Sequence, residues 1–433
     1  MKKLIKICEY ILLILFLILV PFLKDKLSIL ISLPVLIGLY FLVKNEKIKN
    51  FTVFIFILSL IIRLVSIFIL KVEIVDDFKT MLDASRNLIN GNLSFTNSFY
   101  FVAFPYQLGH VLYQALLLKI INSVLFLKII NSIITSFIVV FIYLIGKELV
   151  SEKTSRIISI SYLLYFYPLY LNSVLTNQHL PVLLILISIY LLIKKPSTYK
   201  YTIIISILLG LANIMRTESI IIIMGIVIYK LLELTKKNKK EVLTNIILLL
   251  GVYFIFINLI SFLVYVSPIN KKLNNSYPEW KFYCGLSNKY NGIYNSEDEK
   301  IFFSEKNKKE LLINRVKEDK LKLPVLFLKK ETILWTQTNY DLRLKNNLNK
   351  YFLLFNQGYL NIIILLFIIT LIPSKKEENK KVLLIKILLA LYYGIYMFIE
   401  ISPRYAYILH ILVFLILGIG LERIICYNKW NKR

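Results

Sequence analysis

The chain has 433 residues, 58% of them hydrophobic, and a formal net charge of +27. Its repeated apolar runs are long enough to cross a bilayer, so the composition excludes a soluble protein and indicates an integral, multi-pass membrane protein. Lysine and arginine crowd the short loops and both chain ends. If these short loops are cytoplasmic, the positive-inside rule explains the charge excess, and no nucleic-acid partner is expected.

The N-terminal apolar run, Ile11 to Val20, is interpreted as an uncleaved span because no small-residue cleavage site follows it. With the next run it predicts an extra N-terminal transmembrane hairpin in residues 1–50. Alternating sides must then agree with the basic loops, which predicts an all-α polytopic protein with about twelve transmembrane helices. Spans are expected near 10–23, 28–43, 51–70, 127–146, 156–173, 179–194, 201–215, 218–235, 243–266, 351–372, 382–399 and 405–425.

Residues 51–266 are expected to form a transmembrane core with a long outer loop at 71–128. The apolar stretch Tyr106 to Ile121 lies in this loop, and a crossing there would invert every later loop. We therefore expect it to lie at the outer interface as a helix.

Residues 267–350 are expected to form a small extracytoplasmic cap with a helical pattern around Glu299 to Lys322, and residues 351–433 form the C-terminal transmembrane helices. The cysteines Cys8, Cys284 and Cys426 are far apart in the sequence and make no metal-binding pattern, and no disulfide is expected.

The adjacent acids Asp76 and Asp77 open the outer loop directly after an apolar run, where a carboxylate can act as a general base at a membrane surface. Neighbours on a helix point about 100° apart, so the two acids are expected to have different roles. Asp83, seven residues after Asp76, lies on the same face if this stretch is helical. The alternative is a solvated helix start, where acids are favoured by the dipole.

Two arginines, Arg216 and Arg404, lie at span ends on the expected outer side and are suited to gripping a lipid phosphate. The alternative is that they reach to headgroups, or pair with Glu218 and Glu400. In the short turn at 176–181, the amides of Asn177 and Gln178 and the imidazole of His179 are suited to binding sugar hydroxyls, or else anchor a helix end at the interface.

The order of these motifs resembles the GT-C glycosyltransferases, specifically a bacterial member of the protein mannosyltransferase and aminoarabinose transferase superfamily. The resemblance covers roughly Phe51 to Leu421. It rests on the acid pair Asp76-Asp77, Asp83 to Gly91, Phe104-Pro105-Tyr106, Lys128 to Asn131, Tyr143 to Lys147, Thr176 to Pro181, Gly210 to Arg216, Trp280 to Asn288, Gly292 to Asn295, Glu297-Asp298 and Glu400 to Tyr405.

The resemblance implies transfer of a sugar from a polyprenyl-phosphate carrier to a hydroxyl of a cell-envelope glycopolymer or lipid, with inversion, on the extracytoplasmic face of the plasma membrane. It implies that Asp76 is the general base, that Asp77 orients the acceptor, and that Arg216 and Arg404 hold the departing phosphate. The candidate substrate-binding residues are Asp83, Tyr106, Gln178, His179, Arg216, Glu400, Arg404 and Tyr405.

The sequence departs from the family at Asn177 and Gln178, where a second acid is common. This weakens the case for a metal held between the two loops, so no cofactor is assigned; a divalent metal is possible but not indicated. Two alternatives stay open: a polymerase or ligase of lipid-linked oligosaccharides, which does not require the acid pair, and a transporter or lipid flippase. Against transport, the sequence has no internal repeat, and Arg63 is the main ionisable residue at mid-span depth.

Overall fold

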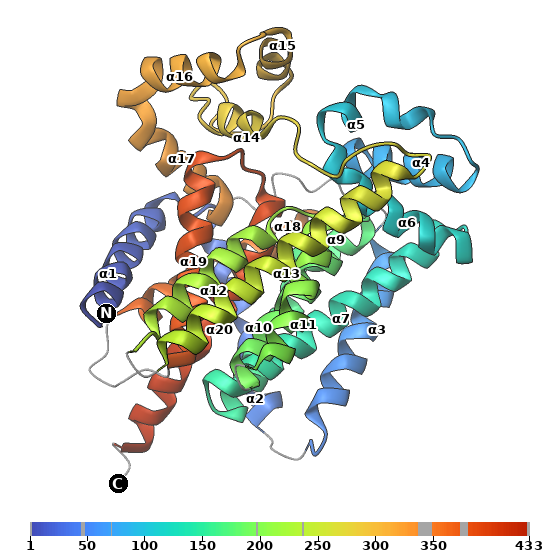
Figure 1. The fold of residues 1–433 in the computed structure, drawn as a ribbon. Coiled ribbons are helices and arrows are strands. Elements are labelled where there is room, and N and C mark those ends of the chain that lie inside the picture. Colours follow the sequence, from blue (N-terminus) through green and yellow to red (C-terminus); the bar gives the residue numbers. More distant parts are fainter. Residues whose placement is uncertain are drawn as a thin grey trace. The chain divides into compact units, whose positions relative to one another are not determined.

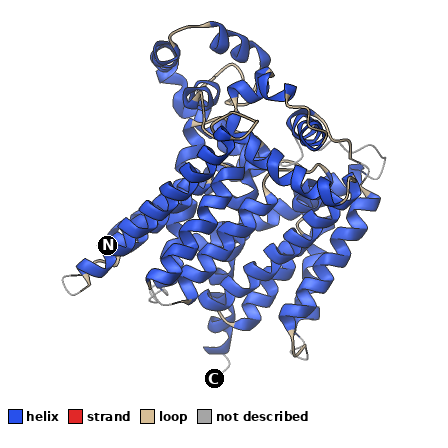
Figure 2. Ribbon diagram, turned by 45° about the vertical axis from the view of Figure 1, so that its right-hand side comes forward, coloured by secondary structure: helices blue, strands red, loops and turns tan. Residues whose placement is uncertain are grey.

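A computed structural model describes residues 2–44, 48–70, 72–195, 198–235, 238–336, 349–372 and 380–430. These residues are helical throughout, with no strand among them (Figures 1 and 2). The only strand-like feature in the described segments is one isolated parallel bridge between Ile293 and Ile401. The expectation of an all-α protein is confirmed.

The described chain contains six helices that are long and apolar enough to cross a membrane. They are α3 (Phe51–Ile69), α7 (Val124–Leu149), α13 (Lys239–Val266), α18 (Asn349–Leu371), α19 (Lys380–Phe398) and α20 (Ala406–Trp430), the last counted together with the short turn before it. Each lies where the sequence predicts a span. Several long apolar helices indicate a membrane protein.

Shorter apolar helices occupy five further predicted spans. They are α1 (Lys2–Leu19) with η1 (Val20–Phe22), α2 (Ile29–Lys44) after η2 (Lys26–Ser28), α10 (His179–Lys194), α11 (Tyr199–Met215) and α12 (Ser219–Leu232). The predicted span at 156–173 is divided into α8 (Glu152–Leu164) and α9 (Phe166–Ser173), with Tyr165 extended between them. Pro168 explains the break, because it has no N–H for the carbonyl of Leu164 and its ring clashes with that turn.

The chain divides into two compact units. Among the described residues, the central unit comprises 48–70, 72–195, 198–235 and 238–276, and the terminal unit comprises 2–44, 277–336, 349–372 and 380–430. In the central unit, α10 packs between α7 and α11, and α11 also packs along α13. In the terminal unit, α18 packs against α1, α2 and α20. The N-terminal helices are therefore part of the core of the terminal unit.

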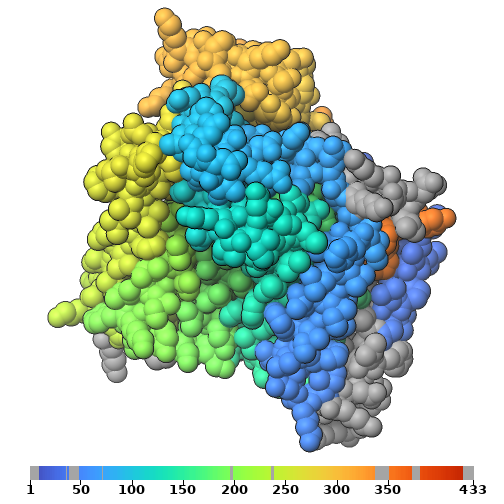
Figure 3. All heavy atoms as spheres, turned by 90° about the vertical axis from the view of Figure 1, so that its right-hand side faces the viewer, coloured from blue at the N-terminus to red at the C-terminus, as the bar shows by residue number. Residues whose placement is uncertain are grey.

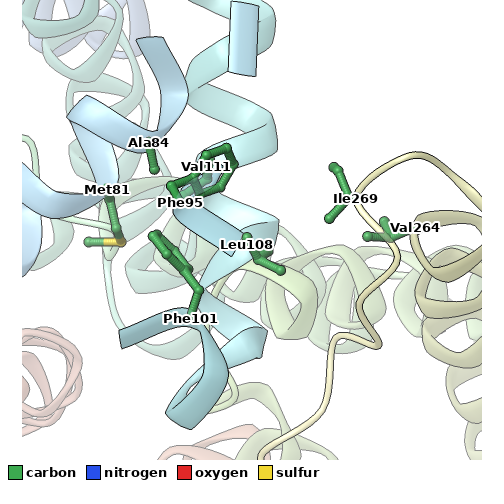
Figure 4. Packing of buried hydrophobic residues seen from close by; sticks show 8 residues of the cluster. All are labelled: Met81, Ala84, Phe95, Phe101, Leu108, Val111, Val264 and Ile269. Carbon is green, nitrogen blue, oxygen red and sulfur yellow. The ribbon is translucent and has the colours of Figure 1, made fainter. Parts of the chain in front are cut away.

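The outer loop predicted at 71–128 is an ordered helical segment. It contains α4 (Asp76–Ile89), η3 (Ser94–Asn97), α5 (Phe99–Ala103), η4 (Pro105–Gln107) and α6 (Leu108–Ile120). In Figure 3 its surface runs without a break from blue through cyan to teal. A hydrophobic cluster holds it together and ties it to the end of α13, through Met81, Ala84, Phe95, Phe101, Leu108, Val111, Val264 and Ile269 (Figure 4).

The predicted cap is a set of short helices within the terminal unit: α14 (Pro278–Gly285), α15 (Ser296–Ser304), α16 (Lys308–Asp319), η5 (Lys320–Lys322) and α17 (Leu323–Thr336). The helical pattern expected around Glu299 to Lys322 is thus three successive helices. Trp280 and Phe302 are buried at its centre, with ring centroids 5.3 Å apart. Arg315 joins α16 to α14 and α15, donating to the Tyr283 carbonyl at 2.9 Å and to Asp298 at 2.7 Å.

Candidate functional site

The acid pair lies after α3, at the start of the helical segment that contains α4, α5 and α6. After α3 the backbone is extended at Val75, and α4 begins at Asp76. Asp76 is exposed and Asp77 is half-buried, so the two carboxylates have different surroundings, as their helical spacing predicts. Both stand in the first turn of α4, where the helix dipole favours negative charge.

Asp76 has a left-handed backbone, with φ of +51°. Such a conformation is uncommon outside glycine, and Asp and Asn are among the residues that tolerate it best. Its carbonyl accepts a hydrogen bond from the Thr80 hydroxyl at 3.2 Å. The chain therefore turns sharply at the residue that the sequence nominates as the general base, and the position constrains which side chains fit.

Asp83 is exposed on the same helix, while Leu82 and Ser85 are buried beneath it. The Ser85 hydroxyl lies 3.2 Å from Gln114 Oε1 of α6 and 3.1 Å from the Val111 carbonyl. These contacts fix α4 on α6 and leave the face with Asp83 toward solvent.

Arg216 lies in a polar network that joins three segments of the central unit. Its Nη1 donates to Asn177 Oδ1 at 3.0 Å, and its Nε donates to Glu218 at 2.6 Å. The Asn177 amide in turn donates to Gln107 Oε1 at 3.0 Å. The side chains of Arg216 and Glu218 are 14% and 17% exposed, so the network is mostly enclosed but reaches solvent. The pairing with Glu218, one of the two expectations for Arg216, is present.

Gly109 allows α6 to approach the end of α11 closely. A Cβ at this position would lie 1.8 Å from the Ile214 carbonyl oxygen, so no larger residue fits without movement of the backbone. The next residue, His110, is only 5% exposed. Burial, together with the nearby charge of Arg216, lowers the pKa of His110 to about 3. The side chain is therefore a neutral imidazole at any ordinary pH.

The turn between α9 and α10 carries Asn177, Gln178 and His179, all of them buried. It begins at Leu175, a buried leucine with φ of +59°, which is an unfavourable conformation for a bulky side chain. Leu175 packs in a hydrophobic cluster with Leu82, Leu118 and Leu127 that holds the turn in this shape. Strain maintained by surrounding packing is common at functional sites.

The packing around Leu175 also relates the acid pair to Arg216. Leu82 of α4 and Leu175 belong to one cluster, and Asn177, two residues beyond Leu175, binds Arg216. The helix that begins with Asp76 thus packs on the turn that holds the guanidinium. Tyr106, in η4 next to Gln107, is half-buried in the same part of the unit.

Arg63 is 1% exposed in the second half of α3. Its Nε donates to the Thr135 hydroxyl of α7 at 2.9 Å, and that hydroxyl lies 3.2 Å from Asn172 Oδ1 of α9. His179 is close enough to interact electrostatically with both Arg63 and His110. Among the described residues every buried carboxylate belongs to the terminal unit: Glu9, Asp298, Glu331 and Glu400. Among its described residues, the central unit buries cationic and neutral polar groups only.

In the terminal unit, Glu400 is 5% exposed and forms an ion pair with Lys281 of α14 at 2.6 Å. The Tyr405 hydroxyl donates to the other carboxylate oxygen at 3.2 Å. Arg404 is half-buried, with its guanidinium carbon 5.6 Å from the centre of the Tyr405 ring. The Glu400 carboxylate is thus bound by a lysine of α14 and a tyrosine five residues after it.

The segment around Glu400 is fixed by the cap. Lys330 Nζ donates to the carbonyls of Gly285, Met397 and Ile399 at 2.7 to 2.8 Å. A Cβ on Gly285 would lie 2.4 Å from the Glu400 nitrogen, so only glycine permits this approach. The backbone carrying the terminal-unit candidates is therefore held in a defined position.

Sequence reasoning did not nominate Gln107 or His110 as binding residues. Asn177 is among the amides expected to bind sugar hydroxyls, but its partner Gln107 lies 70 residues away and has no distinguishing pattern. His110 stands on an apolar helix, where a buried histidine is usually structural. Their proximity to Arg216 comes from the tertiary packing of α6 on α11.

Within the described segments, no group of three or more His, Cys, Asp and Glu side chains is suited to hold a metal ion. Comparison with known proteins gives no family model that matches the sequence and no matching curated protein. The functional interpretation therefore rests on the residues and their arrangement.

Proposed function

We propose that the chain is a membrane glycosyltransferase that moves a sugar from a polyprenyl-phosphate carrier to a hydroxyl of an envelope glycopolymer or lipid on the outer face of the plasma membrane. The observation that carries the proposal is the exposed Asp76 at the strained start of α4, a helix that packs on the turn binding Arg216. A carboxylate and a guanidinium in one unit supply a base and a phosphate-binding group.

In the proposed reaction, an acceptor hydroxyl oxygen attacks the anomeric carbon of the sugar and its proton passes to the Asp76 carboxylate. The bond between that carbon and the phosphate oxygen breaks, and polyprenyl phosphate leaves with the bonding electrons. Attack from the opposite side inverts the configuration. Asp77, half-buried beside the base, is assigned to orienting the acceptor.

Arg216 is assigned to the departing phosphate, whose growing negative charge a guanidinium stabilises through charge-assisted hydrogen bonds. Glu218 holds Arg216 in place when no phosphate is bound, and Asn177 fixes its other edge. The proposal gives Arg404 the same phosphate-binding role, with Glu400 and Tyr405 beside it, and this part rests on the sequence resemblance alone.

We propose about twelve membrane crossings. The six long helices make six of them, and the shorter apolar helices and the divided pair α8 and α9 make the others. A helix of 14 to 17 residues, such as α12 or α11, is about 21 to 26 Å long. This is shorter than a bilayer core of about 30 Å, so local thinning of the bilayer or burial within the protein must compensate.

Arg63 supports a second candidate, a transporter or flippase of an anionic lipid. A buried cation within a helix suited to span the membrane is costly and often marks a path for charged substrates. A transporter does not require the exposed Asp76 carboxylate, whereas the proposed glycosyltransferase does. Substitution of Asp76 therefore distinguishes the two functions.

The test is mass spectrometry of envelope polymers and lipids from cells that lack the protein, that carry it, and that carry Asp76→Asn. We expect a hexose-sized or pentose-sized substituent to disappear on deletion, to return with the wild-type chain, and to stay absent with a stably inserted Asp76→Asn variant. An unchanged envelope on deletion would contradict the enzyme. Full restoration by Asp76→Asn would favour transport.

A further inference from the structure

His110 combines deep burial with two ring nitrogens that make no hydrogen bond within the protein. Its nearest aromatic neighbour on α6 is Tyr113, with ring centroids 5.9 Å apart, and that contact satisfies neither nitrogen. Buried polar atoms in native proteins nearly always have a partner, and leaving one without a partner has the full desolvation cost. A missing partner at both nitrogens indicates that something outside the chain supplies it.

The surroundings of His110 restrict what that partner is. Gly109 allows this part of α6 to pack against Ile214, two residues before Arg216, and the positive charge of Arg216 is near enough to help lower the pKa of His110. Arg216 and the amides of Asn177 and Gln107 form one hydrogen-bonded network. The site is therefore polar and next to solvent, because the Arg216 side chain is 14% exposed.

The protonation state of the ring decides between an anion and a hydroxyl. A neutral imidazole has one N–H donor and one acceptor nitrogen. A phosphate oxygen only accepts, so it can pair with the N–H but not with the acceptor nitrogen, and protonation of the ring is opposed by burial and by Arg216. A hydroxyl group both donates and accepts, and adjacent hydroxyls can satisfy both nitrogens at once.

We propose that His110 is a substrate-binding residue that reads hydroxyl groups of the sugar while Arg216 faces the phosphate to which the sugar is attached. The inference rests on the proposed function and deepens it, because it assigns the sugar of the donor lipid to His110 and the phosphate to Arg216. Phosphate and ring hydroxyls are only a few bonds apart in a sugar phosphodiester, which matches the closeness of Arg216 and His110.

The test measures binding to the full chain in nanodiscs by microscale thermophoresis. The probes are undecaprenyl phosphate and a panel of hexoses and pentoses linked to undecaprenyl phosphate. We expect the wild type to bind at least one sugar-bearing lipid more tightly than undecaprenyl phosphate. His110→Phe should lose about tenfold to a hundredfold in affinity for that lipid, the loss expected for a buried polar contact, and keep its affinity for undecaprenyl phosphate.

Four further variants complete the design. Arg216→Ala should weaken binding of both kinds of lipid. His410→Phe, a matched replacement of a buried histidine in the terminal unit, should change neither. If His110→Phe does not fold, His110→Leu is a smaller apolar replacement, and His110→Gln should keep most of the preference because its amide also donates and accepts.

The outcomes are separable. A His110→Phe protein that keeps its preference for the sugar-bearing lipid would show that His110 binds only ordered water, and would overturn the inference. Equal loss for both lipids in a folded His110→Phe protein would make it a phosphate-binding residue and also overturn it. A wild type that prefers no sugar-bearing lipid would remove the proposed function itself.

Discussion

Because Asp76 has a left-handed backbone, the choice of substitution can separate its contribution to stability from the contribution of its carboxylate to sugar transfer. Asparagine and glycine tolerate a φ of +51°, whereas alanine in this conformation costs about 1–2 kcal/mol. We expect Asp76→Asn and Asp76→Gly to keep the wild-type melting temperature in detergent. Asp76→Ala should be less stable, and all three should lose sugar transfer by about 10² to 10⁴-fold, the range for a general base.

The comparison includes its own control. Glu305→Gln removes an exposed acid from the predicted cap, outside the candidate site, and isolates the effect of lost charge. If Asp76→Asn transfers sugar at the rate of Glu305→Gln, the carboxylate at position 76 is not the base. A melting temperature of Asp76→Ala equal to that of Asp76→Asn would show that the backbone strain at this residue is relieved elsewhere.

At the scale of residues, the sequence indicates charged groups far better than it indicates their partners. Asp76 and Arg216 are visible because they interrupt apolar runs. The bonds from Asn177 to Gln107 and to Arg216 span 70 and 39 residues, and no local pattern encodes them. The positive φ of Leu175 is equally hidden, because its cause is packing against Leu82 and Leu127.

At the scale of elements, the approach of α6 to α11 depends on Gly109. A methyl group there would lie 1.8 Å from the Ile214 carbonyl oxygen, so Gly109→Ala must push the helices apart. Overpacking of this kind costs about 1–3 kcal/mol. We expect a lower melting temperature, and weaker binding of undecaprenyl phosphate because Arg216 follows directly after α11.

The matched control is Gly251→Ala in α13, where a Cβ would meet nothing within 4 Å. Replacing a glycine inside a helix by alanine at such a site stabilises by about 0.5–1 kcal/mol. The two Gly→Ala variants should therefore move the melting temperature in opposite directions. A stabilised Gly109→Ala protein would show that the contact between α6 and α11 is loose.

The cap depends on Arg315 in a comparable way. Its guanidinium binds Asp298, whose side chain is 4% exposed, and stacks 3.6 Å from the centre of the Tyr283 ring. Removing one partner of a buried ion pair costs about 3–5 kcal/mol, so Arg315→Ala should make the cap sensitive to limited proteolysis. Lys289→Ala, which breaks the exposed pair with Glu297, should leave the digestion pattern unchanged.

The same pair predicts a pH dependence. Burial alone would raise the pKa of Asp298, but hydrogen bonds from Arg315, Asn295 and Ser287 and the charge of Arg315 hold it below its usual value. A lowered carboxyl pKa stabilises the fold above about pH 4 and the gain is lost as pH falls through the folded-state pKa. The difference in cap stability between wild type and Arg315→Ala should therefore shrink as the pH falls below about 4.

Element boundaries show where a hydropathy pattern is sufficient and where it is not. The six long helices follow the apolar runs closely, because a run of about 20 apolar residues has few alternatives to a spanning helix. The segment 156–173 is less apolar than these runs, with serines and tyrosines along its length, and Pro168 divides it. Hydropathy averaged over a window of residues does not detect the one backbone N–H that Pro168 lacks.

At the scale of the whole molecule, the two units differ in what they bury. The central unit encloses Arg63, His110 and His179 with no buried carboxylate among its described residues, whereas Glu331 and Glu400 are buried in the terminal unit. This segregation is not readable from the sequence, since it depends on which face of each helix is enclosed. It gives the central unit the electrostatic character suited to an anionic lipid phosphate.

The placement of the helical segment 72–123 on the outer face depends on whether α6 crosses the membrane. With 13 residues α6 is about 20 Å long, too short for a core of about 30 Å, whereas the 26 residues of α7 reach about 39 Å. Residues 97 and 151, both exposed, should therefore lie on opposite sides. We expect a membrane-impermeant maleimide to label Asn97→Cys in intact cells and Ser151→Cys only after permeabilisation, with the native Cys8, Cys284 and Cys426 replaced by alanine. Labelling of both residues from the same side would mean that α6 and α7 both cross the membrane or that neither does. The membrane sides assigned to Asp76 and to the short basic loops would then be wrong.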